Sequence, residues 1–287
     1  MKTISLTISD EWSEKQIKSI MKNKLGFSAA LITRQKRYDN GILLNGEKVN
    51  VTERVKTGDT LVFNLCDESS KNIVPTDMPL DVIYEDEDVI ALNKPRNMPT
   101  HPSIRHFDDT LANGLMYYFK NTDFTFRVVT RLDRDTSGIV LVAKNPFSAH
   151  RLCEKMREGE IKKEYYAICH GAPKEATGRI DAPIKRCNDS IITRCVSPDG
   201  KEAITDYIVE KEKNSLALIH LMPLTGRTHQ IRVHLSHIGH PIYGDDMYGS
   251  PIKDKRTLLH CGKVTFPHPS SNEIMSVIAP LPDDMVI

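Results

Sequence analysis

Apolar and polar positions along the first quarter of the chain predict two short helices followed by a group of short strands. Apolar residues recur at helical spacing within residues 13–24, and Ser28 can cap a second helix that starts at Ala29. Residues 41–49 are typical of two strands joined by an Asn-Gly turn, and residues 60–63 continue as a further strand. We therefore expect a small α/β unit at the start of the chain.

The pattern changes after a polar stretch at residues 66–72, which with Pro75 and Pro79 behind it has the composition of a linker. Beyond this stretch, apolar runs bounded by turn residues predict strands, and helices are predicted after Asn145 and near Thr228. The expected strands are residues 82–84, 89–92, 139–143, 163–169, 203–209 and 216–221. Many strands and few helices favour an α+β fold, with a mixed, largely antiparallel β-sheet and flanking helices.

These boundaries predict an N-terminal domain at residues 1–72, a linker at 73–79 and a large domain at 80–287. The composition agrees with this division, because 287 residues, of which 39% are apolar, can bury one sizeable core and a smaller second one. No run approaches the roughly 18 apolar residues of a membrane span, and the first residues lack the features of a secretory signal. We expect a globular protein in the cytoplasm, without a membrane partner.

The six cysteines are scattered along the chain without any Cys-x-x-Cys pair. This spacing argues against a zinc ribbon and against a disulfide framework, so we interpret them as reduced. Four histidines lie between residues 229 and 240. His229 and His234 are five residues apart, whereas two metal ligands on one helical face need i, i+4 spacing, and no carboxylate completes a site. The sequence predicts no metal site.

The net charge is only +1, but its distribution is uneven. Residues 15–56 contain ten basic and three acidic residues, a local balance of +7 on an otherwise acidic chain. A basic module of this kind indicates binding to phosphates through salt-dependent contacts that do not depend on base sequence. A solvated surface that binds nothing is the alternative.

Near the middle of the chain, residues 131–135 place two guanidinium groups and two carboxylates directly before the apolar run 139–143. A charged turn that leads into a strand would explain the pattern without any chemistry. The other interpretation is a site in which an aspartate, Asp133, is held by cations. The rest of the sequence decides between the two.

Three further motifs follow in order: Lys163-Glu164-Tyr165-Tyr166-Ala167, the run from Leu224 to Leu235, and Gly239-His240-Pro241-Ile242-Tyr243-Gly244-Asp245. Together with residues 131–138 they resemble the RluA family of RNA pseudouridine synthases, over roughly residues 80–282. Residues 41–63 resemble the small S-four-like RNA-binding domain, although the usual opening of its first helix is missing. The resemblance implies the pseudouridine synthase fold for the large domain.

The reaction that the resemblance implies breaks the bond between the uracil nitrogen and the ribose, rotates the base and rejoins it through ring carbon five. It needs no redox step, and the resemblance implies neither metal nor cofactor. It does need a carboxylate that adds to the ribose or stabilises its charge, and a pocket that excludes water. Asp133 is the expected nucleophile.

The resemblance also assigns roles to neighbouring residues. A buried carboxylate stays ionised beside a fixed cation, and we expect Arg227 to be that cation. Tyr165 is expected to pack on the flipped base, and Arg131 to fill the space that the uridine leaves. Members of the family often carry His before this arginine, whereas this chain carries Thr130. Asp135 is expected to shape the turn or hold Arg134 instead of taking part in the chemistry.

The expected partner is RNA, with ribosomal RNA favoured over transfer RNA, and the expected oligomeric state is a monomer. RNA contacts are predicted for residues of both domains. They are Arg131, Lys94, Lys163, His229, Arg232, Arg34, Lys36, Arg37 and Lys48.

Two other functions fit parts of the sequence. Asp133-Arg134-Asp135 matches the Asp-x-Asp signature of aspartate-nucleophile phosphatases, with Gly244-Asp245-Asp246 as a source of magnesium ligands, but the run from Thr225 to Gln230 has no place in that class. A non-catalytic RNA-binding protein is the other alternative. All three catalytic positions are occupied, which argues against it.

Overall fold

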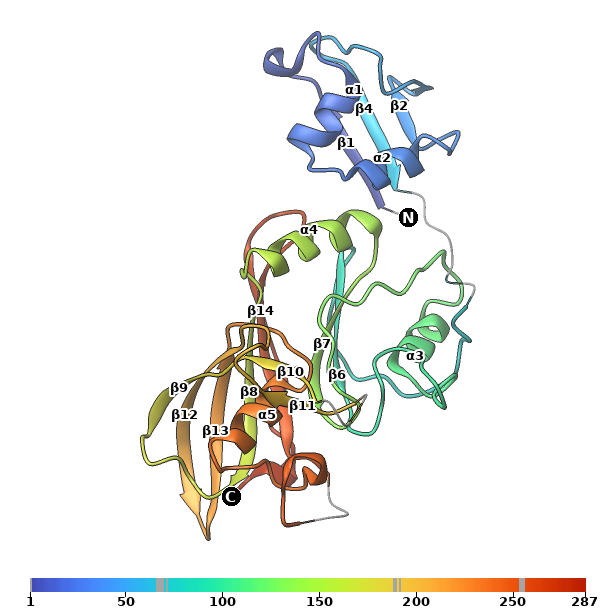
Figure 1. The fold of residues 1–287 in the computed structure, drawn as a ribbon. Helices are drawn as coiled ribbons and strands as arrows, with labels where there is room; N and C mark the ends of the chain where they lie inside the picture. The colour runs from blue at the N-terminus through green and yellow to red at the C-terminus, as the bar shows by residue number, and fades with distance from the viewer. Residues whose placement is uncertain (1, 66–69, 71, 188–189, 191, 253–255) are drawn as a thin grey trace.

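The computed structural model describes residues 2–65, 70, 72–187, 190, 192–252 and 256–287, and these form two units with separate sheets (Figure 1). The first unit has a four-stranded sheet in the order β1-β4-β2-β3. Its elements are β1 (Lys2–Thr7), a 3-10 turn (Asp10–Trp12), α1 (Ile17–Ser19) continued by a π-helical turn (Ile20–Lys24), α2 (Ala29–Gln35), β2 (Ile42–Leu44), β3 (Glu47–Lys48) and β4 (Thr60–Leu65).

The two predicted helices and the Asn-Gly hairpin of this unit are confirmed, whereas strand β1 was not predicted. Ser28 caps α2 by accepting a hydrogen bond from the Leu31 amide at 3.1 Å. Residues of β1 are alternately half-buried and exposed, because the strand lies at the sheet edge beside β4. An edge strand with so few large apolar residues leaves a weak signal in the sequence.

The second unit is built on a nine-stranded sheet in the order β5-β6-β7-β14-β8-β13-β12-β9, with β15 paired to β14. Its neighbours are antiparallel except for the parallel pair β7 and β14, so the largely antiparallel α+β prediction is confirmed. The strands are β5 (Val82–Glu85), β6 (Val89–Lys94), β7 (Ser137–Ala143), β8 (Lys162–His170), β9 (Thr177–Asp181), β12 (Ile204–Lys213), β13 (Leu216–Pro223), β14 (Leu259–Pro267) and β15 (Ile274–Ile278).

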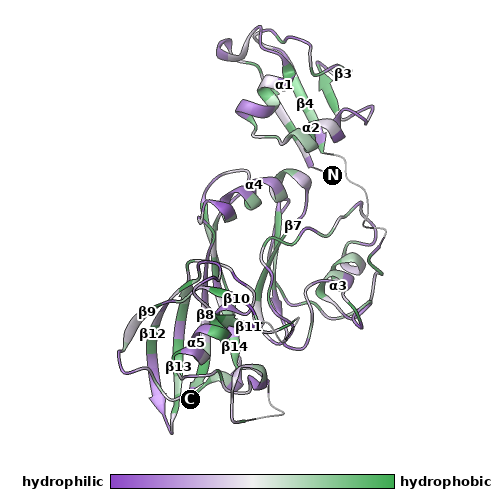
Figure 2. Ribbon diagram, in the orientation of Figure 1, coloured by the Kyte–Doolittle hydropathy of each residue, from purple (hydrophilic) through white to green (hydrophobic). Residues whose placement is uncertain are grey.

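Helices and a separate hairpin complete this unit. They are α3 (Leu111–Tyr118), α4 (Pro146–Arg157), the hairpin β10 (Ile184–Arg186) and β11 (Arg194–Val196), α5 (Gln230–His237), and 3-10 turns at Asp246–Tyr248 and Asp283–Met285. As predicted, Asn145 caps α4 through the Ser148 amide at 2.9 Å. Hydrophobic residues run along the strands that form the cores, such as β7 and β4 (Figure 2).

The order of β6, β7 and β14 brings distant segments together at one end of the large sheet. Lys94, the last residue of β6, pairs with Gly138 at the start of β7. Gly138 has φ +109°, and a Cβ there would lie 2.2 Å from the carbonyl oxygen of Cys261 in β14. Only glycine allows this close approach of the two strands. The charged run 131–135 precedes β7 and therefore lies at this same end.

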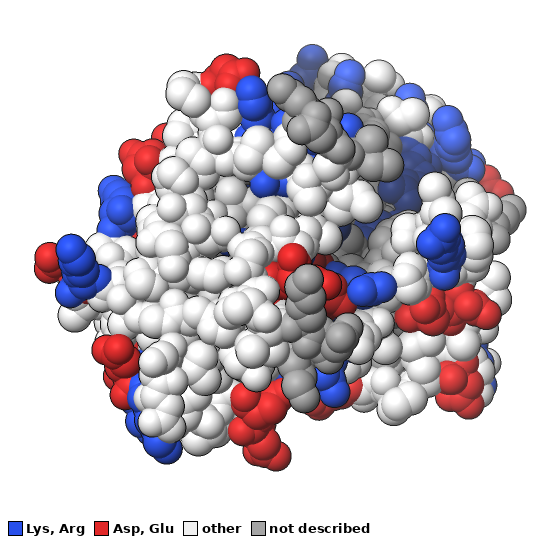
Figure 3. All heavy atoms as spheres, turned by 60° about the horizontal axis from the view of Figure 1, so that its bottom comes forward, with Lys and Arg blue, Asp and Glu red and all other residues white. Residues whose placement is uncertain are grey.

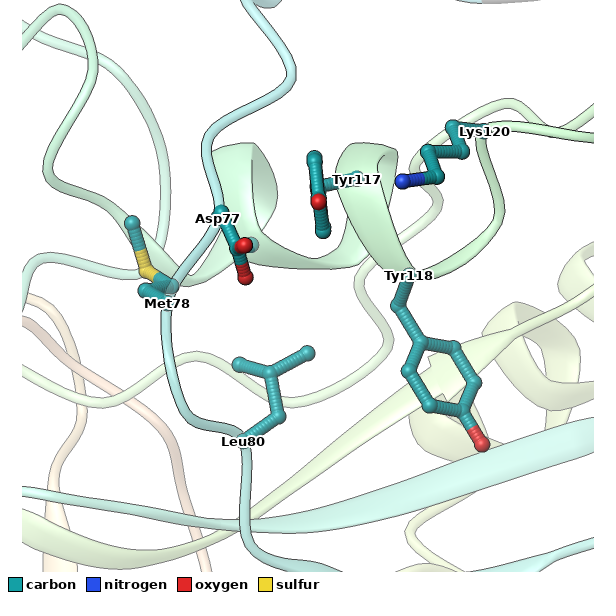
Figure 4. A pocket seen from close by; sticks show the side chains of 7 residues that line it. Asp77, Met78, Leu80, Tyr117, Tyr118 and Lys120 are labelled. Carbon is teal, nitrogen blue, oxygen red and sulfur yellow. The ribbon is translucent and has the colours of Figure 1, made fainter.

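The segment that enters the large unit crosses α3 at Gly114. A Cβ at Gly114 would lie 2.8 Å from Met78 Cγ and 2.9 Å from Leu80 Cδ2, so the absence of a side chain lets the segment pack on the helix. Figure 4 shows Met78 and Leu80 beside this helix, in a pocket that Tyr117 also lines. The predicted linker, residues 73–79, thus packs on α3 through Met78.

The two units contact each other where the first strand meets the start of α4. Lys2 Nζ lies 2.5 and 2.6 Å from the two carboxylate oxygens of Asp88 in the β5–β6 turn. Phe147 of α4 is buried in the apolar cluster of the first unit, with its ring centroid 5.7 Å from that of Phe27. The first unit therefore lies at the end of β7 that is opposite to residues 131–135 (Figure 1).

Asp88 remains ionised although only 2% of the residue is exposed. Burial raises its pKa, but hydrogen bonds from Lys2, Ser148, Ser270 and Asn145 outweigh burial and lower the pKa from 3.8 to about 2. The contact between the units therefore contains a buried ion pair whose contribution to stability depends on pH.

We expect acid to destabilise the wild-type protein more than the Asp88→Asn variant. A carboxyl group whose pKa is lower in the folded state stabilises the fold above its unfolded pKa, and this contribution is lost as the pH falls toward the folded pKa. The full contribution is about 2 kcal/mol, of which about 1 kcal/mol is lost between pH 5 and pH 3. Chemical unfolding at both pH values measures it, with the exposed Asp123→Asn as the control. Equal losses in wild type and Asp88→Asn would contradict this role of Asp88.

Candidate active site

Asp133 lies in the segment that leads into β7, at the end of the sheet opposite to α4. Its side chain is 32% exposed. The Thr136 amide donates a hydrogen bond to the Asp133 carbonyl at 3.2 Å, which closes a tight turn. The buried Leu132 anchors the other side of the turn, and its carbonyl accepts from Thr100 Oγ1 at 3.0 Å. The carboxylate is thus presented to solvent from a backbone that is held in place. Figure 3 shows this end of the molecule hollowed, with Lys and Arg side chains gathered around the hollow.

Lys94 supports this segment from inside the protein. Its residue is fully buried, and Nζ donates to the carbonyls of Pro95 at 2.8 Å, Met98 at 2.8 Å and Arg134 at 3.1 Å. Burial lowers the pKa of Lys94 to about 7, against the attraction of Asp135 and Asp133. The prediction that Lys94 contacts RNA is therefore wrong, because the register of β6 and β7 turns the amine inward.

The Lys94→Met variant is expected to lose about 3 kcal/mol of unfolding free energy, because three buried carbonyls lose their donor at about 1 kcal/mol each. The rate of the reaction in which Asp133 is the expected nucleophile should fall about tenfold, since a displaced Arg134 backbone moves the adjacent Asp133. Chemical unfolding and single-turnover assays measure the two effects. The exposed Lys162→Met is the matched control. An unfolding free energy within about 0.5 kcal/mol of wild type would exclude an anchoring role.

Arg232 is the arginine that lies beside Asp133. Its Nη1 is 3.7 Å from Asp133 Oδ2, and its side chain is only 5% exposed. Its Nε and Nη2 donate to the two oxygens of Asp245 at 2.7 and 2.8 Å. Burial opposes the charge, but Asp245 and Asp133 outweigh burial and raise the pKa of Arg232. Asp245 therefore fixes a permanently charged guanidinium that faces Asp133.

The expectation that Arg227 pairs with Asp133 is corrected by this geometry. Arg227 is exposed, and its Nε donates to the Glu202 carbonyl at 2.8 Å. Its amide donates to Gln230 Oε1 at 2.9 Å, so Arg227 lies in the turn that precedes α5. Arg232 is on the first turns of the helix itself, on its buried side. The sequence predicts a helix near Thr228, but Arg232 lies about 100° around that helix from the apolar Ile231, so helical spacing alone does not single out Arg232.

His229 completes the polar surroundings of Asp133. It adopts a left-handed backbone conformation with φ +57°, and its Nε2 is 3.9 Å from Asp133 Oδ2. Its Nδ1 lies 2.7 Å from the hydroxyl of Tyr248. Burial lowers the pKa of His229 and Arg232 lowers it further, while Asp133 raises it. The lowered pKa favours a neutral His229 ring beside Asp133, and the contact with the Tyr248 hydroxyl holds this ring in place.

Tyr165 lines the site from β8. It is 7% exposed and pairs in register with Cys261 of β14. Burial raises the pKa of Tyr165 well above its ordinary value, and Cys261 and the nearby Asp133 raise it further. The phenol thus stays protonated, with its ring in the wall of the site. The contributions of Cys261, Asp245 and Tyr248 were not recognised in the sequence.

The other residues of the charged run face different ways. Arg131 is exposed, and no carboxylate among the described residues pairs with it. Arg134 Nε donates to Asp135 Oδ1 at 3.0 Å, which confirms the prediction that Asp135 holds Arg134. Thr130 is 2% exposed, and its Oγ1 accepts from the Leu141 amide at 2.9 Å. The side chain in place of the family's usual histidine therefore points into the protein.

The remaining predicted RNA contacts lie at the surface or at the edge of the site. Lys163 is half-buried, and its Nζ lies 4.0 Å from the position of a Cβ on Gly226. Burial lowers the pKa of Lys163. In the first unit, Lys48 is exposed and pairs with Asp39 at 2.5 Å. Lys36 and Arg37 are exposed and Arg34 is half-buried, all at or near the end of α2.

Neither a metal cluster nor a membrane span is found within the described ranges. No group of three or more His, Cys, Asp or Glu residues there could hold a metal ion. No described helix is long and apolar enough to cross a membrane. Asp245, which a phosphatase would need as a magnesium ligand, is fully buried and occupied by Arg232.

Comparison with known proteins relates this site to one enzyme class. A family model described as RNA pseudouridylate synthase matches residues 88–237. An uncharacterized RNA pseudouridine synthase of Bacillus subtilis is 41% identical over 266 residues, covering 91% of this chain and 94% of that protein. Ribosomal large subunit pseudouridine synthase D of Escherichia coli K12 is 37% identical over 266 residues, covering 86% of this chain and 81% of that protein. The solved structure of human RNA pseudouridylate synthase domain containing 1 gives a TM-score of 0.62 at 30% identity, covering 70% of this chain and 83% of that one.

Proposed function

The chain belongs to the RNA pseudouridylate synthase family, and from this membership we propose that Asp133 is the nucleophile with which it isomerises uridine in ribosomal RNA. The enzyme is an RNA pseudouridine synthase. The observation that supports Asp133 most directly is the 3.7 Å distance from its half-exposed carboxylate to the buried Arg232.

In the proposed reaction the Asp133 carboxylate attacks the ribose carbon as the bond to the uracil nitrogen breaks, or stabilises the charge that develops there. The freed uracil rotates within the pocket, and its ring carbon five forms the new bond to the ribose carbon. Any bond between that carbon and Asp133 breaks in the same step, which releases the carboxylate. Carbon five then loses its proton and the former bonding nitrogen gains one, so atoms and electrons balance without a cofactor.

Arg232 is proposed to keep Asp133 ionised when bound RNA excludes water from the site. A carboxylate in a dry pocket would otherwise take up a proton and lose its nucleophilicity. The Asp245 hydrogen bonds at 2.7 and 2.8 Å support this role, because they fix the guanidinium before the substrate binds.

Tyr165 and Arg131 are proposed to handle the base. The buried Tyr165 ring, whose pKa the charge of Asp133 helps to raise, is suited to pack on the detached uracil, and its high pKa leaves the hydroxyl as a hydrogen-bond donor. The exposed Arg131, two residues before Asp133, is suited to fill the gap in the RNA stack that the flipped uridine leaves.

The unit at residues 1–72 is proposed to bind the same RNA and so to raise its affinity. The exposed Lys36 and Arg37 at the end of α2 and the local charge of +7 support this role. The Escherichia coli relative, whose name assigns it to the large ribosomal subunit, supports ribosomal RNA as the substrate. We propose that the enzyme acts as a monomer, because Asp133, Arg232 and Tyr165 come from one chain.

Mapping pseudouridines in ribosomal RNA from cells with and without this protein tests the proposed substrate. We expect one or a few positions to lose the modification and to regain it when purified protein is added. The rate in the purified reaction should not change when EDTA is present, whereas a magnesium phosphatase would lose its activity. If the pseudouridines of ribosomal RNA are unchanged and pseudouridines of transfer RNA are lost, the substrate is transfer RNA and not ribosomal RNA.

A further inference from the structure

A small exposed hairpin lies between β6 and α3, next to the site. The amides and carbonyls of Ser103 and His106 exchange two hydrogen bonds, both 2.9 Å, around a two-residue turn of Ile104 and Arg105. Arg105 has φ +71°, a conformation that few residues other than glycine adopt. The turn is therefore a defined structure that presents two particular side chains at its tip.

The side chains of this hairpin are unusually exposed for their chemistry. Ile104 is 86% exposed and Phe107 is 69% exposed. Arg105 is exposed too, and no described carboxylate pairs with it. Single exposed apolar residues are common on proteins, but an isoleucine, an arginine and a phenylalanine within four positions present apolar side chains together with one cation.

The hairpin is attached to the residues that hold Asp133. Thr100, three residues before the turn begins, donates to the Leu132 carbonyl at 3.0 Å. The ring of His101 packs on that of Phe126 with centroids 5.7 Å apart. On the other side, the Phe107 carbonyl accepts from Asn113 Nδ2 of α3 at 2.8 Å. The backbone is fixed at both ends while the side chains stay free.

We propose that Ile104, Arg105 and Phe107 contact the nucleotides that flank the target uridine and help to select the RNA context that the enzyme accepts. The proposal rests on the proposed function, since flipping a uridine at Asp133 unstacks its neighbours. Unstacked bases bind apolar and aromatic side chains and guanidinium planes, and the adjacent phosphates attract a free arginine. RNA is favoured over a protein partner because the hairpin is continuous with the Thr100–Leu132 contact beside Asp133.

The test compares two variants of the full-length enzyme with a matched control. Ile104→Ser combined with Phe107→Ser removes the apolar side chains, and Arg105→Gly removes the guanidinium while tolerating the positive φ. Ile274→Ser combined with Ile278→Ser is the control, because these residues on β15 are 69% and 63% exposed. The substrate is large-subunit ribosomal RNA from cells that lack the protein, with thermal unfolding recorded for every variant.

We expect KM for this RNA to rise about tenfold in both hairpin variants while kcat stays close to the wild-type value. The KM of the control variant should stay within about twofold of wild type. Changing the nucleotides on either side of the target uridine should lower kcat/KM for the wild-type enzyme more than for the hairpin variants. Wild-type kinetics and wild-type discrimination in both variants, with normal thermal unfolding, would overturn the proposal. Capture of a protein partner by wild type but not by such variants would assign the hairpin to that partner instead. An inactive wild-type enzyme would instead count against the proposed function.

Discussion

Replacing Asp133 with asparagine is expected to abolish pseudouridine formation, with a loss of at least about 10⁴-fold in rate. Asparagine has nearly the same shape but cannot act as a carboxylate nucleophile. RNA binding should stay within about threefold of wild type, because most of the affinity comes from contacts to the phosphate backbone. Single-turnover assays and filter binding with the same RNA measure the two quantities.

The matched control for this variant is Asp135→Asn. Asp135 is a second aspartate two residues away, and its contact with the exposed Arg134 is a surface ion pair that contributes little. We expect its rate to stay within about threefold of wild type. Pseudouridine formation by Asp133→Asn at the wild-type rate would remove Asp133 from the chemistry, and loss of activity in Asp135→Asn alone would transfer the role to Asp135.

Replacing Arg232 with methionine is expected to lower kcat by about 10²-fold or more, because the developing charge at Asp133 loses a fixed cation. Replacing Arg227 with methionine should change kcat by less than about threefold, since this exposed side chain bonds only to a backbone carbonyl in the described structure. The contrast between the two arginines, measured in single-turnover assays, tests which one serves the site. The opposite order of effects would restore Arg227 as the partner of Asp133.

Loss of Arg232 also leaves Asp245 buried without its partner, which is expected to cost about 3 to 5 kcal/mol of stability. A second variant separates this effect from catalysis. In Asp245→Asn the guanidinium remains but loses its charged anchor. We therefore expect a smaller fall in kcat and a smaller loss of unfolding free energy than in Arg232→Met. Arg232→Lys should restore charge without the bidentate geometry and recover part of the rate. A rate that follows thermal stability across all three variants would reduce Arg232 to a structural role.

The sequence predicted the parts of the site that depend on local chemistry. Asp133 was recognisable because charge directly before a buried strand requires an explanation, and Tyr165 because its motif follows in order. The helix that carries Arg232 was also predicted. The sequence predicts an RNA contact for Arg232 and a catalytic role for Arg227, since both arginines belong to one motif. What separates them is that Arg227 is exposed in the turn before α5, whereas Arg232 lies on the buried side of the helix.

Lys94 shows the same limit in another element. A lysine after an apolar strand and before a proline is typical of an exposed loop, so an RNA contact was the natural interpretation. The pairing of Lys94 with Gly138 instead directs the amine under the segment that holds Asp133, where three carbonyls accept its hydrogen bonds. A single sequence does not contain that pairing, because it joins two strands that are distant along the chain.

The amino-acid sequence by itself determined the α+β class, the nucleophile candidate and the family resemblance, because periodicity, charge clusters and motif order are local properties. The tertiary structure decided which cation faces Asp133, that Asp245 holds it, and that Lys94 supports the turn from below. These facts depend on strand register and on the phase of α5 relative to the sheet. Both are set by packing between segments far apart in the chain. A shift of one residue reverses which side chain points inward in a strand and rotates the side chains of a helix by about 100°.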